Sequence, residues 1–155
     1  MKKTVTVLVL AAMMVFMLTA CGGKSKDITV DVTKLCEDLQ STVTSGELAS
    51  VSSDLQASTY FFDLTKVEES AAALSSGASA CEVAVVKCKD SSYASEVKGL
   101  FETRVKNQSD LFADYNAPEV AKLDNALIRT SGNYAVLCVT DDTKKAEEIL
   151  KEAGF

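Results

Sequence analysis

The first 20 residues of the chain have the layout of an export signal, which decides what part of the sequence is left to fold. Lys2 and Lys3 precede an apolar run from Val5 to about Leu18, and small residues follow it. A charged segment, an apolar segment and a small-residue cleavage site, in this order, are typical of a secretory signal peptide. The apolar run is shorter than the roughly 20 residues that a membrane-spanning helix needs, so cleavage is favoured over a retained helix.

A cysteine stands directly after the expected cleavage site. The tetrapeptide Leu18-Thr19-Ala20-Cys21 resembles the bacterial lipobox, in which the cysteine receives a diacylglycerol thioether and the chain is cleaved before it. We therefore expect a signal peptide over residues 1–20, a lipid-anchored tether over 21–27 and a single globular domain over 28–155. The lipid on Cys21 would hold this domain at the outer, extracytoplasmic face of the bacterial cytoplasmic membrane.

Length and charge limit the partners of the mature chain. Cleavage after Ala20 leaves 135 of the 155 residues, which is enough for one compact core. All 22 acidic residues remain but two of the 16 basic residues are removed, so the formal charge becomes −8. Without a basic stripe we expect no nucleic-acid partner. Attachment to the membrane should depend on the acyl chains on Cys21.

The chain contains no histidine, and this limits its chemistry further. Histidine is the commonest general base and metal ligand near neutral pH, so serine-histidine and cysteine-histidine mechanisms are excluded. The sequence also lacks a nucleophile elbow, a zinc-protease helix and a glycine-rich nucleotide motif. We expect no catalytic residue, no cofactor and no metal. Catalysis by carboxylates or lysine alone is the least favoured alternative.

Two groups of residues with side-chain oxygen ligands could indicate a cation site, and each has a simpler explanation. The first group is Asp110, Asp114, Asn116 and Glu119. The spacing of these residues does not fit a calcium-binding loop. The solvated end of a helix is the simpler explanation for so many polar residues. The second is Asp141-Asp142, at the start of the expected last helix, where acidic residues cap the backbone and interact favourably with the helix dipole.

Four cysteines remain after Cys21 is assigned to the lipid: Cys36, Cys81, Cys88 and Cys138. Cys81 and Cys88 lie in one expected strand, too far apart to form a disulfide with each other. Cys88 and Cys138 could be neighbours across two strands. Free buried thiols are favoured over a disulfide, because a cysteine in apolar surroundings often behaves as a small hydrophobic residue.

Periodicity and turn residues predict an α+β domain of two layers, an antiparallel sheet of three or four strands packed against two or three helices. We expect helices over 32–44, 92–114 and 142–153, the last capped by Thr140 or Asp141. Strands are expected over 81–88, 124–130 and 134–140, the last two joined by a turn at 131–133. A loop over 46–68 should hold a short helical turn, with the aromatic cluster at 60–64 as a core plug, and a further short turn should follow Pro118.

The longest expected helix has one stripe that faces the sheet and one side that faces water. Val97, Phe101, Arg104 and Gln108 lie on the stripe, whereas Glu96, Glu102, Lys106 and Asp110 lie on the water side. The strand over 134–140 is apolar on both faces. Its second face is therefore either covered, by the 46–68 loop and the first helix, or a docking surface.

Four segments carry a resemblance to a known family. They are Cys81–Lys87, Tyr115–Pro118, Asn125–Ile128 and Gly132–Val139. Together they resemble an uncharacterised family of small lipoproteins of clostridial-type Gram-positive bacteria, a domain of unknown function. The resemblance implies a further strand near Glu69–Leu74, which would form a hairpin with the strand that follows. The residues at 70–74 favour helix on propensity alone. The resemblance implies no catalytic residue, ligand or partner.

These observations favour a non-catalytic module that binds an envelope protein, a glycan or a small solute. The alternative is a structural or assembly component of an envelope complex, and an enzyme is less favoured than both. A concave polar pocket would favour solute binding. An uncovered apolar sheet face would favour assembly, and a pocket with two close carboxylates would favour an enzyme.

Lipidation of Cys21 is directly testable. The Cys21→Ala precursor should not be cleaved and should lack the mass of the acyl chains, because only this cysteine stands at the lipobox position. Intact-mass measurement of wild-type and variant protein from the same host checks both effects. An unmodified Cys21 in the wild-type mature chain contradicts the prediction.

Overall fold

The computed structural model describes residues 28–76 and 79–155, so the signal peptide, the tether and Cys21 lie outside the described residues. Its helices are α2 Val32–Gln40, α3 Ser53–Tyr60, α4 Ser91–Tyr115, α5 Ala117–Asp124 and α6 Thr143–Ala153, with a 3-10 turn at Leu64–Lys66. Its strands are β1 Leu48–Ser50, β2 Val67–Ser75, β3 Glu82–Cys88, β4 Leu127–Ser131 and β5 Tyr134–Val139. None of the described helices is both long enough and apolar enough to cross a membrane.

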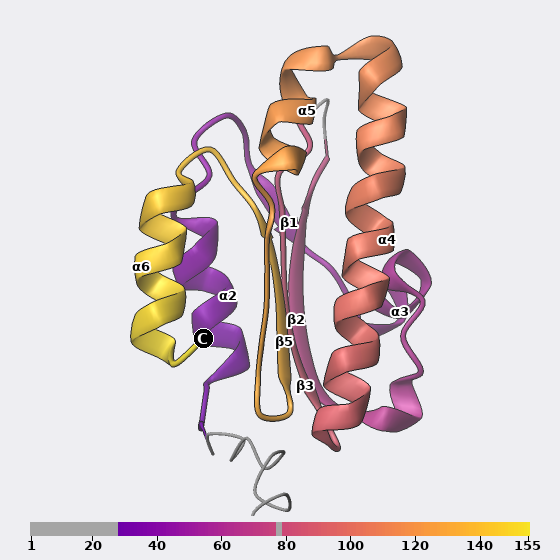
Figure 1. The fold of residues 1–155 in the computed structure, drawn as a ribbon, viewed down its shortest axis with the longest axis vertical. Coiled ribbons are helices and arrows are strands. Elements are labelled where there is room, and N and C mark those ends of the chain that lie inside the picture. The colour runs from indigo at the N-terminus through magenta and orange to yellow at the C-terminus, as the bar shows by residue number, and fades with distance from the viewer. Residues whose placement is uncertain (1–27, 77–78) are drawn as a thin grey trace, which may run out of the picture.

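The strands form one antiparallel sheet in the order β1-β2-β3-β5-β4 (Figure 1). The two long buried strands, β3 and β5, lie at its centre. Side chains alternate between the faces of a strand, so Val83 and Val85 point to one side of β3 while Ala84 and Val86 point to the other. All four are fully buried. Both faces of the central strands therefore require a cover.

Helices cover both faces, so the domain has three layers, not the expected two (Figure 1). On one face, Phe101 of α4 packs in a core with Leu137 and Val139 of β5, and this core extends to α3 and α5. On the other, Leu39 of α2 and Leu150 of α6 pack in a core with β3 and β5. The expectation of three or four strands and two or three helices was also too low, since the described residues contain five of each.

The second apolar face of β5 is covered and is not a docking surface. Val136 lies on the side of α2 and α6, and Leu137 lies on the side of α4. Both side chains are 0 % exposed. The first helix covers one face, as the first alternative expected. Its main partner there is α6, and Leu48 of the 46–68 segment also packs against this core. Other residues of that segment, such as Tyr60 and Phe62, join the core on the opposite face.

The expected loop over 46–68 is more regular than its sequence indicates. It holds β1, α3, the 3-10 turn and the start of β2. Residues 69–74 are strand, as the family resemblance implied, because pairing with β1 and β3 outweighs the helix propensity of the alanines. The core-plug prediction is half right. Tyr60 and Phe62 are buried, whereas Phe61 is 75 % exposed and Leu64 is 38 % exposed.

Local signals fix the ends of the elements in the second half of the chain. The Asp90 side chain caps α4 by accepting a hydrogen bond from the Tyr93 N–H. Asp142 caps α6, not the expected Thr140 or Asp141. Gly132 has a φ of 55° at the first position of the two-residue turn between β4 and β5, where a side chain would be strained.

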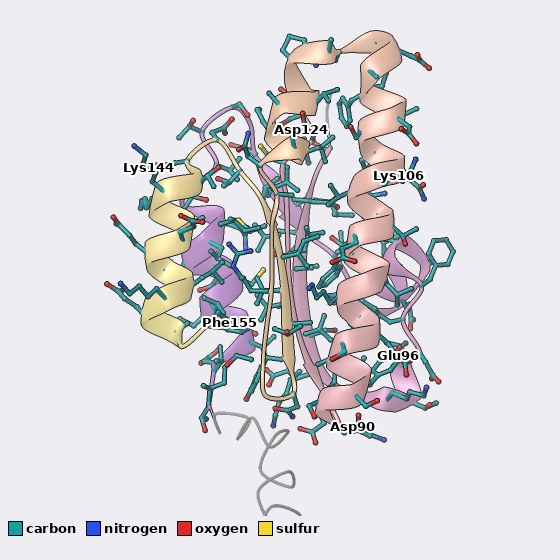
Figure 2. All side chains as sticks on the ribbon, viewed as in Figure 1. Asp90, Glu96, Lys106, Asp124, Lys144 and Phe155 are labelled. Atoms are coloured by element: carbon teal, nitrogen blue, oxygen red, sulfur yellow. The ribbon has the colours of Figure 1, made fainter. Side chains whose placement is uncertain are left out.

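The water-facing side of α4 is as predicted. Glu96, Glu102, Lys106 and Asp110 are exposed. Figure 2 shows Glu96 and Lys106 on the outer surface of this helix, away from the sheet. Lys106 forms an exposed ion pair with Asp110 one turn later, at 2.6 Å. Such pairs contribute little to stability, so this side mainly confers solubility.

All four described cysteines are free and buried, as expected. Burial is the main cause that raises the pKa of Cys36 to about 11 and the pKa values of Cys88 and Cys138 to about 12. These three thiols are therefore protonated at neutral pH and serve as small apolar side chains.

Lysine at position 136 or 137 should unfold the domain. Each substitution puts an unpaired charge into a closed core, and we expect a loss of more than about 3 kcal/mol in the free energy of unfolding. Thr130→Lys on exposed β4 is the control and should change that free energy by under about 0.5 kcal/mol. Urea unfolding followed by circular dichroism measures all three. A folded, wild-type-like Val136→Lys or Leu137→Lys protein would show that one face is open.

Candidate functional site

Polar side chains gather at the end of the sheet where β3 begins. Glu82 is the first residue of β3 and is 2 % exposed. The register places it between Leu74 of β2 and Val139 of β5, beneath the second half of α4. Arg104 reaches it from the sheet-facing stripe of α4. A buried carboxylate needs a charged or hydrogen-bonded partner, and Arg104 supplies it.

Three side chains form this buried polar set. The Nε of Arg104 donates to both carboxylate oxygens of Glu82 at 3.2 Å, and its Nη2 donates to Oε2 at 3.2 Å. The Tyr60 hydroxyl donates to Oε2 at 3.2 Å. Burial raises the pKa of Glu82, and the nearby Arg104 charge opposes that rise. Burial, with the neighbouring Glu82 charge, raises the pKa of Tyr60 as well.

A cavity of 140 Å³ lies beside this set, and we call it the Arg104 cavity. Glu82, Arg104 and Gln108 form its polar side. Phe112 and Tyr115, whose ring centroids are 5.0 Å apart, form an apolar side. Arg104 also borders a separate hollow of 70 Å³, which is lined by Phe61, Leu100 and Asn107 among others.

A second polar group, the Lys122 cluster, lies next to the cavity. Lys122 Nζ is 2.9 Å from Glu119 Oε1 and 2.9 Å from Asp141 Oδ1, and it donates to the Ser45 hydroxyl at 2.8 Å. The three charged side chains are 18 %, 13 % and 17 % exposed respectively, although the backbone of Asp141 is open to solvent. The Cys81 sulfur lies 3.7 Å from Lys122 Nζ.

Backbone groups complete this cluster. Asp141 Oδ2 accepts hydrogen bonds from the N–H groups of Thr44 and Ser45, at 2.7 and 2.8 Å. Glu119 Oε2 accepts from the Ala80 N–H at 2.7 Å and from the Ser79 hydroxyl at 3.2 Å. The cluster therefore ties α5, the loop after α2, the approach to β3 and the end of β5 together.

The pKa values show that the Lys122 cluster is charged. Burial alone would raise the pKa of Asp141, but hydrogen bonds from Lys122, Thr44 and Ser45 outweigh it and hold this pKa well below its usual range. Hydrogen bonds from Ala80 and Lys122 likewise outweigh burial and lower the pKa of Glu119. Burial would lower the pKa of Lys122, but Asp141 and Glu119 raise it. All three groups are ionised at neutral pH.

The arrangement favours holding a ligand over proton transfer. Each of the three inward carboxylates, on Glu82, Glu119 and Asp141, already accepts hydrogen bonds from a cationic side chain. A general acid or base needs a proton that can be exchanged with a substrate near the working pH. In the described part of the chain, no group of three or more acidic or cysteine side chains is placed to hold a metal ion.

Sequence reasoning placed some of these residues and missed others. Asp141 was expected to cap α6 and Glu119 to lie at a solvated helix end, but both bind Lys122. Asp110 is exposed, as expected, and its ion-pair partner is Lys106. Glu82 was missed. The signal that could have found it is a single acid at the start of an apolar strand, together with Arg104 on the apolar stripe of α4.

These features define an α+β domain with an open antiparallel sheet, covered on both faces, and a polar cavity at one end. The model of a family described as "Domain of unknown function (DUF4358)" matches residues 42–140, and the chain belongs to this family. Searches of curated proteins and of solved structures gave no match. The matched range begins after α2 and ends before α6, and it includes Glu82, Arg104, Gln108 and Lys122.

Asp141→Asn should change both stability and its dependence on pH. At neutral pH we expect a loss of about 1–3 kcal/mol in the free energy of unfolding, because Lys122 loses a charged partner. A carboxylate with a lowered folded-state pKa stabilises above its unfolded pKa of about 3.9, and this stabilisation disappears as the pH falls through the folded-state value. The wild-type and variant curves should therefore converge in acid.

Urea unfolding at a series of pH values from neutral to strongly acid measures this convergence. Asp124→Asn is the control, since Asp124 is an exposed aspartate of α5 (Figure 2) and should change the free energy of unfolding by under about 0.5 kcal/mol. Parallel wild-type and Asp141→Asn curves would show that Asp141 does not carry the acid sensitivity.

Proposed function

We propose that this protein is a lipid-anchored, non-catalytic binding module of the bacterial cell envelope, which holds a small polar ligand in the Arg104 cavity. The export signal and the lipobox at Cys21 support its place at the outer face of the cytoplasmic membrane. Membership of the matched family, a domain of unknown function, supplies no activity.

The observation that carries the proposal is the fixed polar wall of the Arg104 cavity. Glu82 belongs to a central strand, and its carboxylate holds the Arg104 guanidinium in one orientation through three contacts. A site whose donors are held in place before binding loses less conformational entropy when the ligand arrives. Ligand sites typically combine apolar surface with a few convergent polar groups, as Tyr115 and Gln108 provide here.

The state of the reactive groups supports binding over turnover. The thiols of Cys36, Cys88 and Cys138 are buried, and their raised pKa values keep them protonated. The thiolate is the nucleophilic form of cysteine, so these three are poor nucleophiles. Glu82 is engaged by Arg104 and Tyr60, which leaves it in a positioning role.

One observation favours the alternative, a structural or assembly component. Phe61 ends α3 in the left-handed conformation, with a φ of 63°, and its side chain is 75 % exposed. An exposed aromatic residue on a constrained backbone is suited to contact a partner protein. The uncovered sheet face that would have strengthened this alternative is closed by α2 and α6.

Ligand-induced stabilisation tests the proposal. The full chain, purified with its lipid in detergent, is unfolded thermally in the presence of small sugars, amino acids and carboxylic acids. We expect one class to raise the midpoint in a saturable manner and to be recovered chemically unchanged. Gln108→Trp should abolish this effect by filling the cavity, whereas Lys106→Trp, on the outer side of the same helix, should not.

Three results would count against the proposal. The first is that no solute raises the midpoint of the wild-type protein. The second is that Gln108→Trp binds as well as Lys106→Trp, which would place the ligand elsewhere. The third is chemical conversion of the bound solute, detected by mass spectrometry, which would indicate an enzyme.

A further inference from the structure

We infer that the ligand of the Arg104 cavity carries a carboxylate group, bound by the edge of the Arg104 guanidinium that Glu82 leaves open. The inference rests on the proposed function of the cavity as a binding site and specifies the chemistry of its ligand. It is derived from the hydrogen-bond geometry of Arg104 and from the side chains beside it on α4.

A guanidinium group presents five N–H donors, four of which form two forks. One fork consists of Nε and Nη2, and the other consists of Nη1 and the second hydrogen of Nη2. Glu82 occupies the first fork, since its oxygens lie 3.2 Å from Nε and 3.2 Å from Nη2. No residue in ranges 28–76 and 79–155 accepts a hydrogen bond from Nη1.

The open fork is accessible. The side chain of Arg104 is 25 % exposed. Nη1 has no partner in the described residues and is not fully buried. Arg104 contributes to the wall of the 140 Å³ cavity. In this inference the open fork faces the cavity and not the 70 Å³ hollow that Arg104 also borders, so a ligand there meets the two N–H groups without displacing Glu82.

A flat, singly charged anion suits this fork. Arginine binds carboxylates through two parallel hydrogen bonds, a geometry that a lysine ammonium cannot provide. Glu82 already neutralises much of the Arg104 charge, which disfavours a dianion such as phosphate. The other nearby carboxylates, on Glu119 and Asp141, are both bound to Lys122 and leave Arg104 as the available cation.

Gln108 supplies a further donor. It lies four residues after Arg104 on α4, so both side chains emerge on the same side of the helix and line the same cavity. Gln108 is half-buried and has no hydrogen bond within the described part of the chain. The rings of Phe112 and Tyr115 offer apolar contact to the rest of the ligand.

A free carboxylic acid and the C-terminus of a peptide share this chemistry, and probes can distinguish them. The full-length protein in detergent is titrated at constant ionic strength with sodium acetate, N-acetyl-alanyl-alanine, acetamide or inorganic phosphate. Thermal midpoints and saturation-transfer NMR report binding. Acetate and the dipeptide should bind, whereas acetamide and phosphate should bind at least about tenfold more weakly. Tighter binding of acetate would indicate a free carboxylic acid as the ligand, and tighter binding of the dipeptide would indicate a peptide C-terminus.

Gln108→Glu is the decisive variant. It changes one amide to a carboxylate of the same shape, which can fill the open fork of Arg104 from within the chain. Carboxylate affinity should fall at least about tenfold while the thermal midpoint is unchanged or higher. Ala113→Glu adds the same charge at an exposed position nine residues after Arg104, on the opposite side of α4, and should keep the affinity within about twofold of wild type.

Arg104→Lys provides a second test that does not depend on position 108. The lysine can still pair with Glu82 but lacks a second fork, so carboxylate affinity should fall by about tenfold or more in protein that remains folded. Equal binding of acetate and acetamide, tighter binding of phosphate, or unchanged affinity in Gln108→Glu overturns the inference. A stronger effect of Ala113→Glu than of Gln108→Glu also overturns it.

The outcomes separate this inference from the proposed function. If a sugar or another neutral solute binds and Gln108→Trp abolishes that binding, the proposed function stands and the carboxylate inference falls. If no probe and no other solute binds the wild-type protein, both fall. If carboxylates bind equally well to Gln108→Trp, the site is elsewhere and both are wrong about the cavity.

Discussion

Burial of the two central strands on both faces is the constraint that arranges the rest of this structure. Val85 of β3 and Val136 of β5 are fully buried on one face, and Val86 and Leu137 are fully buried on the other. Apolar surface of this extent must be removed from water on each side, and each face requires helices of its own. The amphipathic helices α2 and α6 cover one face and α4 the other, with α3 and α5 at its margins (Figure 1).

The same burial explains why shielded ionic side chains gather at the end of the sheet where β3 begins. Hydrogen bonds within the helices and between the strands pair the backbone groups of the core. Chain segments that enter and leave the sheet have N–H groups without such backbone partners, such as those of Thr44 and Ala80, and these donate to carboxylates. Carboxylates that accept these bonds need a cation when they are largely shielded from water. Lys122 serves two of them, and Arg104 serves Glu82, which places the cavity between two ionic groups.

Sequence patterns predicted those elements whose periodicity or turn chemistry is strong. The helix around Phe101, the hairpin at Gly132 and the last helix lie close to their expected positions. β2 was ambiguous because its alanines favour helix until two neighbouring strands pair with it. The candidate site was predictable only in part. Arg104 and Gln108 lie on the predicted stripe of α4, but contacts such as Lys122 with Asp141 join residues that are separated in sequence and individually ordinary.

The position of α2 determines how the cavity would be presented. α2 begins at Val32, and Figure 1 shows its start near the end of the sheet opposite α5. With the proposed lipid on Cys21, a seven-residue tether reaches at most roughly 25 Å when fully extended. The cavity lies at the end of the sheet beside α5, so the chain enters the domain at the end remote from it. An anchor attached there would leave the cavity uncovered by the tether.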